Sequence, residues 1–105
     1  MEVKPIRIYI QKDRLELIEK YDYKASLWLA VEEVLKLPFH EVMVALPWEY
    51  EDAVPVMVNV EMKYALAWEQ SPQEVKDRLL SLIDERLTQL VYSYAYMNEL
   101  EGGKV

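Results

Sequence analysis

The sequence contains no cysteine and one histidine, His40. Disulfides, thiolate metal sites and cysteine nucleophiles are therefore excluded, and a site that needs several histidines cannot form within one chain. A serine-histidine-aspartate relay would have to use His40, yet no serine lies in a nucleophile-elbow context. We predict no catalytic residue, no metal site and no cofactor.

Glycine is nearly absent, since Gly102 and Gly103 are the only two. Gly-rich phosphate loops are therefore excluded, and the turns must be made by Asp, Asn, Pro and ordinary residues. We expect one domain over residues 1–101 and a flexible tail over 102–105. No apolar run approaches about 18 residues, and the N-terminus has no signal-peptide pattern. These absences favour a cytoplasmic protein without membrane contact.

Positive charge is also scarce, with 12 Lys and Arg against 19 Asp and Glu, a net charge of −7. The excess of acid lies from Pro38 onward, because the residues before it are balanced. Such a surface repels phosphate backbones, so nucleic acid is an unlikely partner. The one local basic patch would comprise Lys4, Arg7, Lys12 and Arg14.

Three segments have the period-two pattern of strands. In residues 3–11, isoleucines alternate with polar or aromatic residues. Residues 41–46 form a second candidate, ended by Pro47, and residues 54–64 form a third in which Val56, Val58 and Val60 share one face. With 105 residues, 52% of them hydrophobic, the chain can bury roughly 65% of its unfolded surface.

Two segments have helical periodicity. The first runs from Asp13 to Leu37, where Pro38 ends it, with a break expected near 21–23. The second begins at Ser71-Pro72, a typical helix start, and has no glycine or proline before Gly102.

The resulting β-α-β-β-α order predicts an α+β two-layer sandwich, ferredoxin-like or split β-α-β, with sheet order 1-3-2 and both helices on one face. Residues 91–97 are rich in strand-forming types and offer a possible fourth strand. No turn residue separates them from Leu87, so a continuous helix over 71–100 is the preferred interpretation.

A continuous helix over 71–100 would be about 45 Å long, whereas a small domain is about 30 Å across. Its end should therefore extend beyond the sheet and need a partner for its apolar side chains. The predicted self-association seam comprises Ile83, Leu87, Leu90, Tyr94 and Met97. A homo-oligomer, first of all a two-fold dimer, is expected.

A second candidate site is the loop 48–52. Loops that a rigid scaffold holds in place often contain the residues that bind a partner. Trp48 and Tyr50 could offer contact area, and Glu49 and Glu51 could meet a basic partner. In the alternative interpretation the aromatics fold over the core and the acids only solvate the turn.

Two functions follow from these features. The first is a non-enzymatic oligomeric module that acts through self-association and protein contacts. The second is a small-molecule-binding protein or enzyme with a site at a subunit interface. For the second, the element order resembles the tautomerase superfamily, which implies an N-terminal proline base; here residue 2 is Glu2 and Pro5 is internal. A strand over 91–97 would allow a pocket lined by Tyr92, Tyr96, Trp48 and Arg7.

Overall fold

The computed structural model describes residues 2–21 and 24–102, with side chains through Ser93. Within these residues the chain forms two strands and five helices, an α+β fold. The elements are β1 (Val3–Gln11), α1 (Lys12–Tyr21), α2 (Lys24–Leu35), α3 (Phe39–Val42), β2 (Ala53–Glu61), α4 (Met62–Gln70) and α5 (Gln73–Gly102).

The two strands form an antiparallel ribbon that runs from the pair Val3–Glu61 to the pair Gln11–Ala53. One face of the ribbon is apolar and turned inward, and its buried members are Ile6, Ile8, Ile10, Val58 and Val60. The opposite face is largely exposed to solvent. The alternation predicted for residues 3–11 and for the first part of 54–64 is confirmed.

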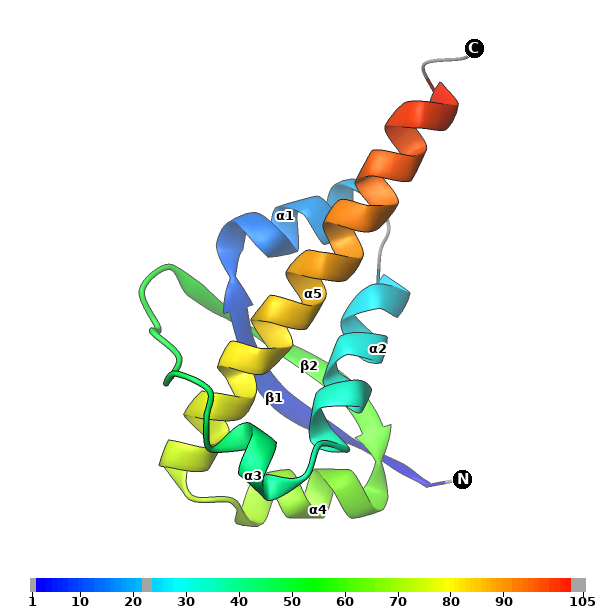
Figure 1. Ribbon diagram of the computed structural model, residues 1–105. Coiled ribbons are helices and arrows are strands. Elements are labelled where there is room, and N and C mark those ends of the chain that lie inside the picture. Colours follow the sequence, from blue (N-terminus) through cyan, green and yellow to red (C-terminus); the bar gives the residue numbers. More distant parts are fainter. Residues whose placement is uncertain (1, 22–23, 103–105) are drawn as a thin grey trace.

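Helices α2 and α5 pack against each other and cover the inner face of the ribbon, as Figure 1 shows. Helices α1 and α4 lie at opposite ends of the molecule. The core forms where the ribbon meets the two long helices, and its fully buried side chains include Ile8, Val31, Leu80, Ile83 and Leu87. Burial of this shared apolar surface is the main favourable term in folding.

The chain consists of two β-α-α units with the same order of elements. Val3 and Ala53 begin the two strands, and Lys12 and Met62 begin the helices that follow, so both pairs lie 50 positions apart. The central pair of the ribbon joins Arg7 to Met57, which are also 50 positions apart. A pseudo-two-fold axis through this pair therefore relates the two units.

Burial and hydrogen bonds follow the same relation. Ile18 of α1 and Trp68 of α4, which are 50 positions apart, are both buried. In the second helix of each unit, α2 and α5, the corresponding residues are 49 positions apart. Three such pairs are buried: Ala30–Leu79, Val31–Leu80 and Val34–Ile83. The amide of Lys12 donates to the Asp52 carbonyl at 3.0 Å, and the amide of Met62 donates to the Glu2 carbonyl at 3.1 Å. The two ends of the ribbon are thus closed in the same way.

The edges of the ribbon also correspond. Trp28 Nε1 donates to the Asn59 carbonyl at 3.0 Å, so this carbonyl points away from β1. Because pairs alternate along an antiparallel ladder, Pro5, which lies opposite Asn59, and Pro55, opposite Tyr9, occupy positions whose backbone groups face outward. A proline at such a position has no N–H to offer to another strand, and this protects both edges from further pairing.

The predicted strand over 41–46 is wrong, and with it the ferredoxin-like 1-3-2 order. Residues 39–42 form α3, and the next residues turn, with the Ala45 amide donating to the Val42 carbonyl at 3.1 Å. Arg78 Nη1 donates to the carbonyls of Met43, at 3.1 Å, and Ala45. These carbonyls are therefore bonded to a side chain of α5 instead of a strand. Within the described residues, only the pairing of the first and third predicted strands is present.

The third predicted strand ends at Glu61, earlier than expected, and residues 62–70 form α4. This segment is rich in Ala, Leu, Met and Gln, which favour helices. Ala65 and Trp68, three residues apart, face the core. The helix ends where the Ser71 hydroxyl donates to the Ala67 carbonyl at 2.7 Å, so this hydroxyl is bonded to α4.

Residues 91–97 belong to α5, so the possible fourth strand is also wrong and the continuous helix is confirmed. Strand propensity depends on a neighbouring strand to pack with, whereas these residues continue a helix that is already formed. The break expected near 21–23 falls on residues 22–23, which lie outside the described residues; α1 ends at Tyr21 and α2 begins at Lys24. The predicted tail over 102–105 lies outside the described residues except for Gly102, which is in α5.

We expect Leu87→Ala to lower the free energy of unfolding by about 2–5 kcal/mol, because it leaves a cavity in a fully buried position. Leu66→Ala is the matched control, since Leu66 is exposed on α4 and should cost less than about 0.5 kcal/mol. Urea unfolding followed by circular dichroism measures both. Equal losses in the two variants would contradict this assignment of the core.

Candidate functional site

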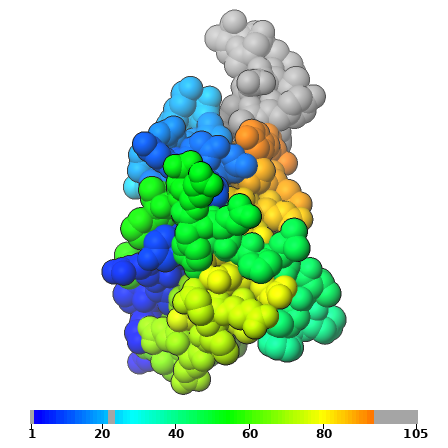
Figure 2. All heavy atoms as spheres, turned by 90° about the vertical axis from the view of Figure 1, so that its left-hand side faces the viewer, coloured from blue at the N-terminus to red at the C-terminus, as the bar shows by residue number. Residues whose placement is uncertain are grey.

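The connection from α3 to β2 carries the predicted binding loop. In Figure 2 this green segment lies at the surface between α1, in blue, and the yellow residues at the start of α5. The Trp48 amide donates to the Asp77 carbonyl of α5 at 2.9 Å, and the Trp48 side chain is buried in the core. The indole is therefore part of the fold, as the alternative interpretation proposed.

Tyr50 is held by three side chains. Its hydroxyl donates to Asp77 Oδ1 at 2.6 Å and accepts from Gln73 Nε2 at 3.0 Å, while its ring meets Tyr9 edge-on at 5.2 Å between centroids. Partial burial, followed by the bond to the Asp77 carboxylate, raises the pKa of Tyr50 to about 12. The phenol therefore stays protonated as a fixed donor across the physiological range.

The two acids of the predicted loop are exposed, and the structure gives neither Glu49 nor Glu51 a partner among the described residues. Asp52 ends the loop in the left-handed region, with φ of 57°. Aspartate tolerates this conformation better than most residues, and the Asp52 carbonyl accepts the Lys12 amide. Of the four predicted binding residues, two are used in packing and two remain available to solvent.

The predicted self-association seam is divided by the structure. Ile83 and Leu87 are fully buried against the same chain, and Leu90 packs on the edge of that core. Ile83 and Leu87 therefore face the core of their own chain. The side chains of Tyr94 and Met97 lie outside the described residues, although their backbone is helical.

A charged cluster links α1 to α5. Arg14 Nε donates to Thr88 Oγ1 at 2.8 Å and lies 4.0 Å from Asp84 Oδ1, and the guanidinium lies 5.6 Å from the centre of the Tyr92 ring. Burial raises the pKa of Asp84, while Arg14 acts in the opposite direction. The cluster holds the second half of α5 against α1.

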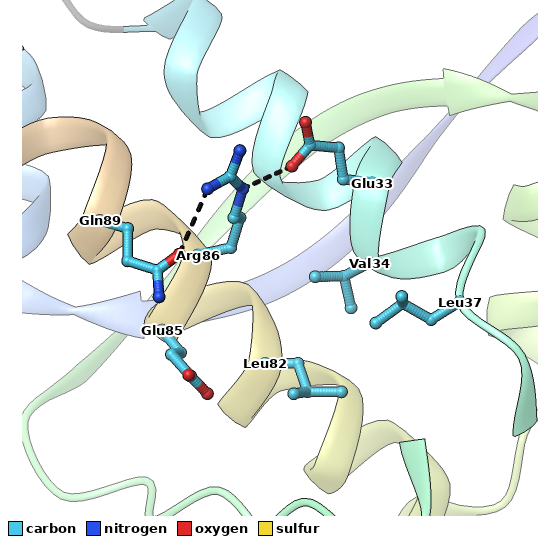
Figure 3. Close-up of a pocket in the computed structure, with 7 residues that line it drawn as sticks. All are labelled: Glu33, Val34, Leu37, Leu82, Glu85, Arg86 and Gln89. Carbon is cyan, nitrogen blue, oxygen red and sulfur yellow. Dashed lines mark hydrogen bonds and ion pairs between the residues drawn. The ribbon is translucent and has the colours of Figure 1, made fainter. Parts of the chain in front are cut away.

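A groove of about 290 Å³ lies between α2 and α5, and Figure 3 shows its lining. Val34, Leu37 and Leu82 form its apolar wall. Arg86 Nε donates to Glu33 Oε2 at 2.5 Å, and Arg86 Nη1 donates to Gln89 Oε1 at 3.2 Å. The ion pair joins the two helices across the groove, so its charges serve the packing of α2 on α5.

Large apolar side chains are exposed along α3 and the turn after it. Val44 is 83% exposed, Leu46 79% and Phe39 68%. The sequence pattern did not indicate this surface, because a strand over residues 41–46 would turn alternate side chains inward. An exposed run of this kind within eight residues is typical of a contact surface. His40, also exposed, lies on α3.

The outward face of the ribbon has little charge. The described residues on this face include one cation, Arg7, and one anion, Glu61. A two-stranded ribbon can enter the major groove of DNA, but affinity depends on cations that neutralise phosphates. Of the other predicted basic residues, Lys4 pairs with Glu69 at 2.8 Å and Arg14 pairs with Asp13 at 3.2 Å. The described residues of the ribbon face therefore carry no net charge.

A pocket at a subunit interface was predicted for the case in which residues 91–97 form a strand. It required a strand over 91–97, which is helical, and it required Trp48, which is buried. The described residues contain no group of three side chains suited to a metal ion. None of the helices, over the residues described, is long and apolar enough to cross a membrane.

No protein-family model, curated protein or solved structure matches this chain. The exposed surfaces and bonded side chains of the molecule itself are therefore the guide to its function.

We expect Tyr50→Phe to remove one phenol that ionises near pH 12, seen as a lost step in the absorbance titration at 295 nm. Because the folded pKa lies above the ordinary value of 10, the stability due to Tyr50 is present below pH 10 and is lost between about pH 10 and 12. At pH 7 the variant should be about 1 kcal/mol less stable.

Tyr92→Phe is the matched control, since the Tyr92 hydroxyl has no hydrogen bond to the described residues. It should change the stability at pH 7 by less than about 0.5 kcal/mol. A difference titration for Tyr50→Phe centred near pH 10 would contradict the proposed hydrogen bond to Asp77.

Proposed function

We propose that this protein is a non-enzymatic module that acts through self-association and protein contacts. The observation that carries the proposal is the extent of α5 beyond its own core. Among the described side chains of α5, Val91 is the last that is buried, and the helix continues to Gly102. Figure 1 shows its last turns extending past the other elements.

The change from core to surface occurs within one residue. Val91 is fully buried, and Tyr92 is 52% exposed with its ring beside Arg14. Beyond this point positions 94 and 97 follow position 90 at helical spacing, and they carry tyrosine and methionine. An apolar stripe on a helix that has left its core is stabilised when a second molecule covers it.

A dimer is the simplest assembly of this kind. Two copies that pair their α5 ends around a two-fold axis bury the same stripe from both sides and close the assembly. The contact area would be provided by the last three turns, separate from the core positions Ile83 and Leu87. The interface in this proposal therefore starts later in the helix than the sequence predicted.

A second surface supports contacts with other proteins. Phe39, Val44 and Leu46 expose apolar side chains on the connection between α3 and β2. The acids of the predicted binding loop, Glu49 and Glu51, follow in the same connection and are also exposed. An apolar patch with a charged border is the usual composition of a transient protein interface.

We expect light scattering to give a molar mass of about twice the 12.5 kDa of one chain, over a range of concentrations. The double variant Tyr94→Lys/Met97→Lys should give one chain mass, because two lysines on the stripe oppose its burial. Its circular dichroism should retain the spectrum of the natural chain.

The matched control is Gln89→Lys/Ser93→Lys, which adds the same charge at two exposed positions of α5. This control should keep the mass of the natural chain. A single-chain mass for the natural protein at every concentration would overturn the proposed self-association.

A further inference from the structure

A groove of about 490 Å³ runs along the outer edge of β2, between this strand and helices α1 and α2. We call it the β2-edge groove. Its walls include Ile18, Leu27 and Trp28 on the helices, and Met57 and Asn59 on the strand. Trp28 is 47% exposed and Met57 57% exposed, so large apolar groups face solvent here.

The pseudo-two-fold relation identifies the equivalent place in the other half of the molecule. On the strands, where corresponding residues are 50 positions apart, Asn59 corresponds to Tyr9. On α2 and α5, where they are 49 positions apart, Lys24 corresponds to Gln73 and Trp28 corresponds to Asp77. Tyr9, Gln73 and Asp77 are the three residues that hold Tyr50. The place equivalent to the β2-edge groove is therefore occupied by an aromatic side chain of the chain itself.

The two halves also differ in how their first helices pack. Helix α4 packs against both strands, whereas α1 packs mainly against its own strand, β1. This leaves the edge of β2 open beside α1. At the equivalent place on β1, Tyr50 of the segment between α3 and β2 fills the space.

We infer that the β2-edge groove binds an aromatic side chain presented by an extended, acidic segment of a partner protein. The equivalent place shows what such a ligand could look like. Tyr50, which fills it, belongs to the non-helical segment 46–50 and is flanked by two acids, Glu49 and Glu51. The structure thus contains one equivalent place that an aromatic side chain fills, held there by residues that differ from those of the open groove.

The residues that differ between the two places define the chemistry of this partner. Lys24 replaces Gln73 and makes no ion pair with the described residues, so it suits a carboxylate next to the aromatic ring. Trp28 replaces Asp77, which removes the acceptor of the tyrosine hydroxyl and adds a ring face for stacking. Glu19 also lines the groove, so its polar border has one charge of each sign.

Insertion of a side chain, rather than addition of a strand, is the mode that this edge allows. Pro55 has no N–H to donate, and the Asn59 carbonyl already accepts from Trp28 at 3.0 Å. A third strand on β2 would lack two of its ladder bonds. The binding free energy must therefore come mainly from contacts with the exposed Trp28 and Met57 side chains.

The test uses a capped synthetic peptide that copies residues 46–52, added to the full-length ¹⁵N-labelled protein. We expect saturable shifts of the Trp28 indole N–H and of the Met57 and Asn59 amides in the NMR spectrum. A peptide with alanine in place of both aromatic residues should produce no saturable shift. Experiments in the Tyr94→Lys/Met97→Lys background keep this result separate from self-association.

Met57→Glu should weaken binding of the peptide at least tenfold, because a negative side chain replaces the apolar wall and repels the acidic peptide. The matched control is Arg7→Lys, at the equivalent position on β1, which should leave the affinity unchanged. Both positions are exposed, so neither substitution disturbs the core.

Four outcomes would overturn the proposal. The first is the absence of shifts at Trp28, and the second is equal binding of the alanine peptide. The third is a set of shifts confined to Tyr9 and Asp77, which would mean that the peptide exchanges with Tyr50. The fourth is a Trp28 signal that depends on protein concentration in the natural chain but not in the double variant, which would make a second copy the occupant.

Discussion

The fold depends on covering one face of a two-stranded ribbon. Two strands alone are at best marginally stable in water, and here their inner face presents Ile6, Ile8 and Ile10 beside Val58 and Val60. Helices α2 and α5 provide that cover together, one from each β-α-α unit. Neither unit can bury its strand alone. The strands of the two units pair with each other around Arg7 and Met57, so the inner face that needs cover belongs to both units. The positions of α1 and α4 at opposite ends follow from this arrangement.

The sequence pattern predicted a strand or helix correctly where the buried face of that element matches the pattern. The isoleucine alternation in residues 3–11 identified β1, and the spacing of Leu80, Ile83 and Leu87 identified α5. The pattern in 41–46 failed because six residues with alternating valines also fit a short helix and a turn, and the Arg78 side chain that binds the turn is distant in sequence. The spacing of the apolar residues in α5 does not indicate whether α2 or a second chain covers them.

The repeated architecture was not visible in the sequence. Residues 3–20 and 53–70 share two identities at the offset of 50, Pro5 with Pro55 and Glu19 with Glu69. What the units share is hydrophobic character at corresponding positions, which many unrelated sequences also have. The binding loop was predicted by its composition alone, and its aromatics became structural because Asp77 and Gln73 lie where the loop passes. Only the three-dimensional arrangement brings those residues together.

The connection between α3 and β2 has a consequence that concerns symmetry itself. Two identical subunits related by a two-fold axis would have two identical grooves, both filled or both open. A chain that joins its halves covalently has one connecting segment, and this segment can pass over one of the two equivalent places only. The single connecting segment therefore makes the molecule asymmetric by topology, whatever residues stand at corresponding positions. Each half can then change independently, one retaining a structural role while the other acquires a ligand.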